Sequence, residues 1–305
     1  MSQTKRPLNA ADLARGALRL TSRIIDRYGP RLTGTENCRR AADELYEELN
    51  SACDTAGREP FEVRPGSFLG FMKVSPTLFI AATFLLFFGY VPVAAIVYTI
   101  AAFMAFTQFI CYRQVFDPFY SVREGVNVYG VIEPVGEVRS QVVVSGHHDS
   151  AYEFTLMARL PRAYRFCVAG MILALTLAPV FAWASVASYN PWGGGSGIAH
   201  ALTVGAIVSF VFMVPMYFFT GRNGTPGAGD NLIASAMIVE LAGYYGKAKK
   251  AGNRTLRHTR LIFASFDAEE AGLRGSRAFV KRHREDLRAV PTNVLNLDSI
   301  YRADR

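Results

Sequence analysis

Two long tracts without a charged side chain constrain this chain more than any other feature of its sequence. Residues 74–112 and 166–221 contain no Asp, Glu, Lys or Arg over 39 and 56 positions. A helix needs about 20 apolar residues to cross a bilayer, so each tract is long enough for two spans. Gly89-Tyr90-Val91-Pro92 would break the first tract, and the loop 189–197 would divide the second. The sequence therefore predicts two transmembrane hairpins, with the lipid bilayer as a partner.

Buried core helices of a soluble protein are the alternative for these tracts. Such helices rarely run this far without a charge on their outward face. Basic residues flank the outer ends of both hairpins, whereas neither tip carries one; they are Arg64, Lys73, Arg113, Arg123, Arg159, Arg162, Arg165 and Arg222. The positive-inside rule then predicts that both termini and the whole soluble part lie in the cytoplasm. The polar residues 1–6 do not resemble a signal peptide.

The remaining residues read as one α/β domain that the hairpins interrupt. Helical periodicity before Gly29 and around Leu45 is followed by strand patterns at 126–132 and 141–145, then by alternating helices and strands up to residue 297. Alternation of this kind favours a largely parallel sheet between helices. The predicted divisions are segments of this α/β domain at 1–73, 113–165 and 222–305 and hairpins at 74–112 and 166–221.

Charge and cysteine content exclude several classes of protein. The formal net charge of +8 invites an anionic partner. Six basic residues between positions 247 and 260 suit a solvated loop or lipid headgroups, and no nucleic-acid-binding module is evident, so nucleic acid is not an expected partner. Four cysteines without metal-binding spacing do not indicate a disulfide framework.

Chemically active residues follow the ends of three predicted strands. His147 and Asp149 follow the strand 141–145, Glu269 and Glu270 follow the strand 261–266, and Asp298 follows the strand 293–297. A fourth segment, the glycine-rich loop before the helix 232–245, carries Asp230. Each segment alone has an ordinary structural explanation, such as a helix N-cap for Asp230. Together, an imidazole and several carboxylates at the same end of neighbouring strands suit zinc.

Four motifs in this order resemble peptidase family M28. They are Gly146-His147-His148-Asp149-Ser150, Gly227-Ala228-Gly229-Asp230-Asn231, the segment 269–276 and Asn296-Leu297-Asp298, and Gly29-Pro30-Arg31-Leu32-Thr33-Gly34 is similar to the opening of that family. The resemblance implies a zinc-peptidase α/β/α sandwich with a mostly parallel mixed sheet, two zinc ions and a peptide substrate.

Residue by residue, the resemblance also implies roles. His147 and Asp298 would bind one zinc ion, Glu270 the other, and Asp230 both. Glu269 would be the general base, and Asp149 would orient His147. His148 is expected to be structural, because it points away from His147 if the strand continues.

One departure from the family pattern leaves alternatives open. Family members complete the second zinc site with a later His, whereas this sequence ends at Arg305. We therefore expect either a C-terminally truncated sequence or a weakly held second ion. Alternatives to the membrane-anchored aminopeptidase are a catalytically silent M28-like membrane scaffold or receptor and a single-zinc acyl transfer like that of glutaminyl cyclases. A transporter has little support, because the spans contain no charged residue.

Overall fold

The computed structural model describes residues 9–190, 194–195, 197–252 and 256–300. The chain divides into two compact units. The sheet unit comprises Met1–Pro65, Val122–Ala151 and Asn223–Arg305, and the helical unit comprises Gly66–Ser121 and Tyr152–Arg222.

The sheet unit is built on a five-stranded sheet in the order β1-β2-β6-β3-β7. Its strands are β1 (Thr55–Val63), β2 (Arg123–Ile132), β3 (Ser140–His147), β6 (Thr259–Phe266) and β7 (Thr292–Asn296). β3 pairs in parallel with β6 and β7, whereas β2 pairs antiparallel with β1 and β6. The sheet is mixed, as predicted, but its antiparallel pairings equal its parallel ones in number.

Strand β1 was not expected from the sequence, because its Gly57 and Pro60 are both depleted in strands. β1 lies at the edge of the sheet, where a proline without an N–H group is tolerated.

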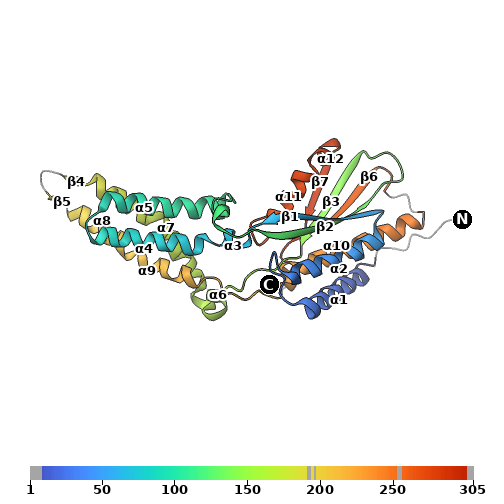
Figure 1. The fold of residues 1–305 in the computed structure, drawn as a ribbon, viewed down its shortest axis with the longest axis horizontal. Helices are drawn as coiled ribbons and strands as arrows, with labels where there is room; N and C mark the ends of the chain where they lie inside the picture. The colour runs from blue at the N-terminus through green and yellow to red at the C-terminus, as the bar shows by residue number, and fades with distance from the viewer. Residues whose placement is uncertain (1–8, 191–193, 196, 253–255, 301–305) are drawn as a thin grey trace. The chain divides into compact units, whose positions relative to one another are not determined.

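Helices cover both faces of this sheet (Figure 1). On one face, α1 (Ala10–Tyr28), α2 (Glu36–Ala52) and α10 (Ile233–Lys250) bury Leu20, Leu45 and Ile238 against the strands. On the other face, α11 (Arg274–Arg282) packs Phe279 against the sheet and α12 (Arg284–Ala289) packs the partly buried Leu287. This three-layer arrangement leaves the carboxyl ends of β3, β6 and β7 at one edge of the sheet.

In the described part of the helical unit, four helices are long and apolar enough to cross a membrane, by length and composition. The candidate spans are Pro65–Phe87, Val91–Ile110, Pro161–Ala187 and Gly197–Phe218. Within them lie α4 (Phe71–Phe87), α5 (Val91–Ala105), α7 (Pro161–Ala187) and α8 (Gly197–Val208). The shorter elements are α3 (Pro65–Phe68), η1 (Phe106–Ile110), η2 (Asp117–Phe119), α6 (Thr155–Arg159), β4 (Tyr189–Asn190), β5 (Gly194–Gly195), α9 (Phe210–Met213), η3 (Val214–Phe218) and, in the sheet unit, η4 (Ala228–Leu232).

Small side chains let the helices of this unit pack closely. Gly170, Ala174, Ala178 and Ala182 recur every four residues along α7 and are buried. The buried side chains of α5 are alanines and Tyr98. Close packing of small residues is the usual way in which apolar helices associate within a membrane.

Candidate metal centre

The predicted site residues meet because three parallel strands end side by side. β3 ends at His147, β6 ends directly before Asp267, and β7 ends two residues before Asp298. His147 lies opposite Phe266 in the register of β3 and β6. The expectation that neighbouring strands deliver these residues to one edge of the sheet is confirmed.

His147 is the centre of the resulting cluster. Its Nε2 atom lies 3.3 Å from Asp230 Oδ1 and 3.7 Å from both Glu269 Oε2 and Asp298 Oδ1. Among the described residues, two groups of three that include His147 could hold a metal ion, with ligand atoms within 4.8 Å of one another: His147, Asp230 and Glu270 form one, and His147, Glu269 and Asp298 form the other. All five sequence-predicted ligand and base residues are therefore brought together.

The loop that carries Asp230 is tied to the end of β7. Gly227 has a φ angle of +54°, a left-handed conformation that favours glycine, and the chain then enters η4 and α10. The Asp230–Asn231 peptide bond is cis. Asn231 Nδ2 donates to the Leu297 carbonyl over 2.8 Å, and the Ile300 amide donates to the Gly229 carbonyl over 3.0 Å. These bonds connect the Asp230 loop to the segment that carries Asp298.

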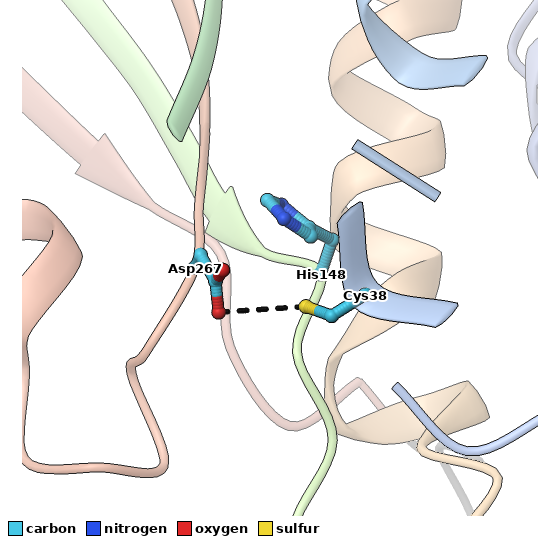
Figure 2. Close-up of side chains that lie close together, drawn as sticks. All are labelled: Cys38, His148 and Asp267. Atoms are coloured by element: carbon cyan, nitrogen blue, oxygen red, sulfur yellow. Dashed lines mark hydrogen bonds between the residues drawn. The ribbon is translucent and has the colours of Figure 1, made fainter. Parts of the chain in front are cut away.

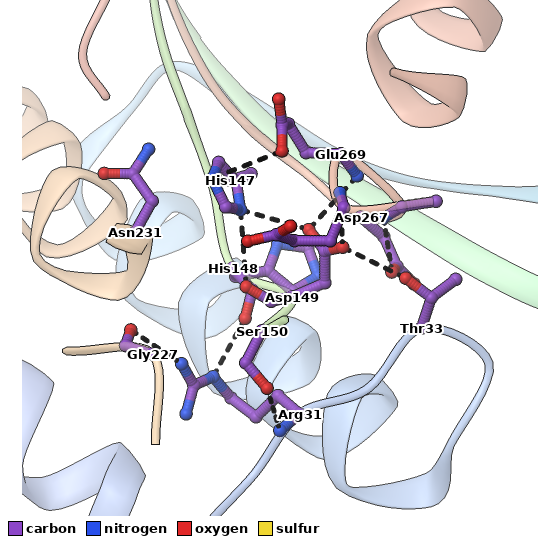
Figure 3. A network of polar contacts seen from close by, with 12 residues as sticks. Arg31, Thr33, His147, His148, Asp149, Ser150, Gly227, Asn231, Asp267 and Glu269 are labelled. Atoms are coloured by element: carbon purple, nitrogen blue, oxygen red, sulfur yellow. Dashed lines mark hydrogen bonds and ion pairs between the residues drawn. The ribbon is translucent and has the colours of Figure 1, made fainter. Parts of the chain in front are cut away.

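Asp149 lies beneath the cluster as a fully buried carboxylate (Figure 3). Its Oδ1 lies 3.2 Å from His147 Nδ1 and accepts the Glu269 amide, also over 3.2 Å. Its Oδ2 accepts the Glu270 amide over 3.1 Å and the Thr33 hydroxyl over 3.0 Å. One carboxylate thus holds the imidazole and the backbone of both glutamates in a fixed relation.

Arg31 holds two of the loops together, a role that could not be predicted from its place in a motif. The residue is fully buried. Its guanidinium donates to the carbonyls of His148, Gly29, Pro226 and Gly227 over 2.8 to 3.1 Å. The first of these carbonyls belongs to the His147 segment and the last two to the Asp230 loop, so Arg31 fixes the distance between them.

The electrostatics of the cluster follow from burial and crowding. Burial alone would lower the pKa of His147, but the adjacent carboxylates of Asp149 and Asp230 raise it to about 11. Burial, aided by neighbouring carboxylates, raises the pKa of Glu269 to about 7 and that of Glu270 to about 8. Burial opposes ionisation of Asp149 as well, but its bond with His147 holds its pKa below the ordinary value. The site thus concentrates negative charge that a cation would relieve.

The surroundings of His147 indicate that these residues could hold a zinc ion. Its Nε2 atom is buried and has no hydrogen-bond partner, although it faces three carboxylates. Its other ring nitrogen is occupied by Asp149, which is the usual arrangement of a metal-binding histidine. Among the described residues, no other histidine belongs to either ligand group. His148 bonds to Ser265 instead, in agreement with its predicted structural role.

Comparison with known proteins gives a family match and more distant similarities. The model described as Peptidase family M28 matches residues 199–305. A curated relative, "Probable glutamate carboxypeptidase" from Arthroderma benhamiae, is 42% identical over 72 residues, which are 24% of this chain and 10% of the relative. The match therefore spans about a tenth of that relative's length.

Solved structures are similar at low sequence identity. An aminopeptidase from Aneurinibacillus sp. strain AM-1 has a TM-score of 0.49 at 12% identity, with 95% of this chain and 71% of that chain covered. A glutaminyl cyclase from an Acidobacteriales bacterium has a TM-score of 0.48 at 12% identity, with 100% of this chain and 64% of that chain covered. Residues 199–305, about a third of the chain, are therefore similar to peptidase family M28.

Proposed function

We propose that the chain is a membrane-anchored, zinc-dependent peptidase of the aminopeptidase type. The observation that carries the proposal is the buried Nε2 atom of His147, which makes no hydrogen bond but lies 3.3 to 3.7 Å from carboxylates of three other segments of the chain. The match of residues 199–305 to the model of peptidase family M28 supports the choice of peptide substrates.

The proposed metal ligands and the proposed general base have separate roles in the reaction. His147, Asp230, Glu270 and Asp298 would hold the metal. Zinc bound in such sites lowers the pKa of its water to about 7 and polarises the substrate carbonyl. Two ions are proposed, as the resemblance implies: His147 and Asp298 would bind one, Glu270 the other, and Asp230 both. His147 Nε2 can serve only one of them, because its Nδ1 atom is engaged by Asp149.

Glu269 is proposed as the general base. Its side chain is partly exposed and its pKa is raised to about 7, so it can both accept and return a proton near neutral pH. It would take a proton from the attacking water and transfer it to the departing amine. Asp149 would hold the Glu269 amide and the His147 ring in place during this transfer.

Replacement of Glu269 by Gln tests this role in the full chain, purified in detergent with zinc. Loss of a positioned acid–base group should lower kcat for an amino-acid amide substrate by about 10²- to 10⁴-fold. Zinc content should remain that of the wild type. Glu285→Gln, an exposed position on α12, is the matched control and should leave the rate unchanged. Wild-type activity in Glu269→Gln would remove the proposed mechanism.

Substrates blocked at either end identify the reaction more closely. An aminopeptidase should cleave peptides with a free amino terminus and not their acetylated forms. Cleavage that instead requires a free carboxyl terminus, or cyclisation of an N-terminal glutamine, would replace the aminopeptidase assignment.

The anchor is proposed to consist of the four apolar helices of the helical unit. Because the basic flanks lie at the outer ends of both hairpins, the sheet unit would face the cytoplasm. A reporter fused after Arg305 should then be active only on the cytoplasmic side. A signal on the opposite side would overturn this orientation.

A further inference from the structure

A third group of metal-ligand side chains lies buried in the sheet unit, apart from the two groups that share His147. It consists of Cys38 on α2, His148 after β3 and Asp267 after β6 (Figure 2). Their exposed fractions are 1%, 0% and 2%. Each offers a ligand atom within 4.8 Å of the other two. Three segments far apart in the sequence thus bring a sulfur, a nitrogen and an oxygen ligand to one buried place.

A buried nitrogen atom of His148 that makes no hydrogen bond indicates that a ligand binds here. Its Nδ1 atom pairs with the Ser265 hydroxyl over 2.9 Å, whereas its Nε2 atom is buried without any partner. Native structures rarely leave a buried polar atom unpaired, because its lost hydration is not replaced. Since Nδ1 is already engaged, Nε2 is the ring nitrogen left to bind a ligand.

The outer contacts of the group resemble those around known metal ligands. A metal-binding histidine usually donates its other ring N–H to a fixed acceptor, as Ser265 provides here, and a ligating carboxylate is itself hydrogen-bonded. Asp267 Oδ2 accepts the Val126 amide over 3.0 Å, and its Oδ1 accepts the Ala268 amide over 2.6 Å. Cys38 Sγ lies 3.4 Å from Asp267 Oδ1. The donor atoms are therefore oriented by the fold.

The charges and the ligand types select the ion. A thiolate and a carboxylate carry two negative charges, which one divalent cation neutralises in a buried setting. A thiolate with an imidazole suits zinc, whereas calcium and magnesium prefer oxygen ligands alone. We propose that Cys38, His148 and Asp267 form a structural zinc site separate from the hydrolytic centre.

Such a site would support the catalytic segments mechanically. It would tie α2 to the residues that follow β3 and β6. His148 is next to His147 in the sequence, and Asp267 is two residues before Glu269. A metal cross-link here would restrict the same two segments that carry the proposed ligand and base.

Cobalt tests the site, because a thiolate bound to Co²⁺ absorbs in the near ultraviolet, whereas imidazole and carboxylate ligands do not. The full chain in detergent, saturated with Co²⁺, should show this charge-transfer band. Cys38→Ser should abolish it and lower the zinc content by one ion per chain. Cys53→Ser, at the end of the same helix, and His147→Ala should retain it. Absence of the band in the wild type, or its persistence in Cys38→Ser, would overturn the proposal.

X-ray absorption at the zinc edge provides a second test that needs no variant. The wild-type chain should show a zinc–sulfur distance of about 2.3 Å. A shell of nitrogen and oxygen alone would contradict the proposal even if Cys38→Ser does not fold. The hydrolytic function is tested separately, since loss of activity in Glu269→Gln should leave both spectroscopic signals intact.

Discussion

Replacement of Asp149 by Asn changes the surroundings of the candidate centre without replacing a proposed metal ligand. The two side chains have nearly the same shape, but the amide accepts hydrogen bonds through one oxygen only. If that oxygen takes the place of Oδ1, it can still accept from His147 and Glu269. The amide nitrogen then faces the Glu270 N–H, whereas the Thr33 hydroxyl can rotate to accept from it. At least one buried backbone N–H is left without an acceptor.

The size of the effect follows from these contacts. A buried donor without a partner costs about 1–3 kcal/mol of stability. Loss of the carboxylate that orients His147 should weaken zinc binding by about 10- to 100-fold, as removal of such outer partners does in other zinc sites. The rate should fall as well, because Glu269 depends on Asp149 for its backbone position.

The assay must report on the sheet unit, since both tryptophans, Trp183 and Trp192, belong to the uncharged tract 166–221 of the sequence. Hydrogen exchange measured by mass spectrometry on peptides from β3 and β6 follows stability there, and competition with a chelator gives the zinc affinity. Asp286→Asn is the control, because that side chain is 74% exposed. Unchanged exchange and unchanged zinc affinity in Asp149→Asn would refute the reasoning.

Three further predictions concern the loops, the packing and the pH dependence of the sheet unit. Arg31→Lys keeps the charge but loses the planar fork that reaches four carbonyls, so it should cost at least about 1–3 kcal/mol in the same exchange assay; wild-type protection would contradict the bracing role. Gly275→Ala should destabilise the sheet unit, because the new Cβ would lie 2.0 Å from the Asp267 carbonyl oxygen. Gly243→Ala is the control and should be neutral or stabilising, because its Cβ would meet no atom within 4 Å. Equal protease resistance of the two variants would be inconsistent with this packing. The metal-free chain should melt at lower temperature as the pH rises from about 5 to about 9, followed by circular dichroism, and saturating zinc should remove that trend. The sign follows because the folded-state pKa values of Glu269, Glu270 and His147 all lie above their ordinary values, so the stability they contribute is lost on deprotonation; a flat or rising melting curve would contradict it.

Much of the fold could be predicted because its signals are local. The uncharged tracts required helices long enough for membrane spans, and the apolar runs before His147 and Asp267 required strands. Strand β1 was missed because its sequence is polar and contains Gly57 and Pro60. The antiparallel share of the sheet was missed because the direction of β2 depends on pairing with distant segments.

The site was predictable to the extent that its residues follow strand ends. Parallel strands deliver such residues to one edge, so His147, Glu269 and Asp298 could be grouped from order alone. The contacts that support the site could not be predicted from the sequence. Arg31 reaches carbonyls more than a hundred positions away, and Cys38 meets Asp267 only in the folded sheet unit. The spacing of residues in the sequence does not predict contacts of this kind.

The central claim is that His147 and the surrounding carboxylates bind zinc. A crystal structure of the full chain grown with zinc, with anomalous data collected at the zinc edge, tests it most directly. The account predicts anomalous density beside His147 Nε2, within coordination distance of Asp298, Asp230 or both. An ordered site without that density, with Nε2 still unpartnered in the presence of zinc, would contradict it.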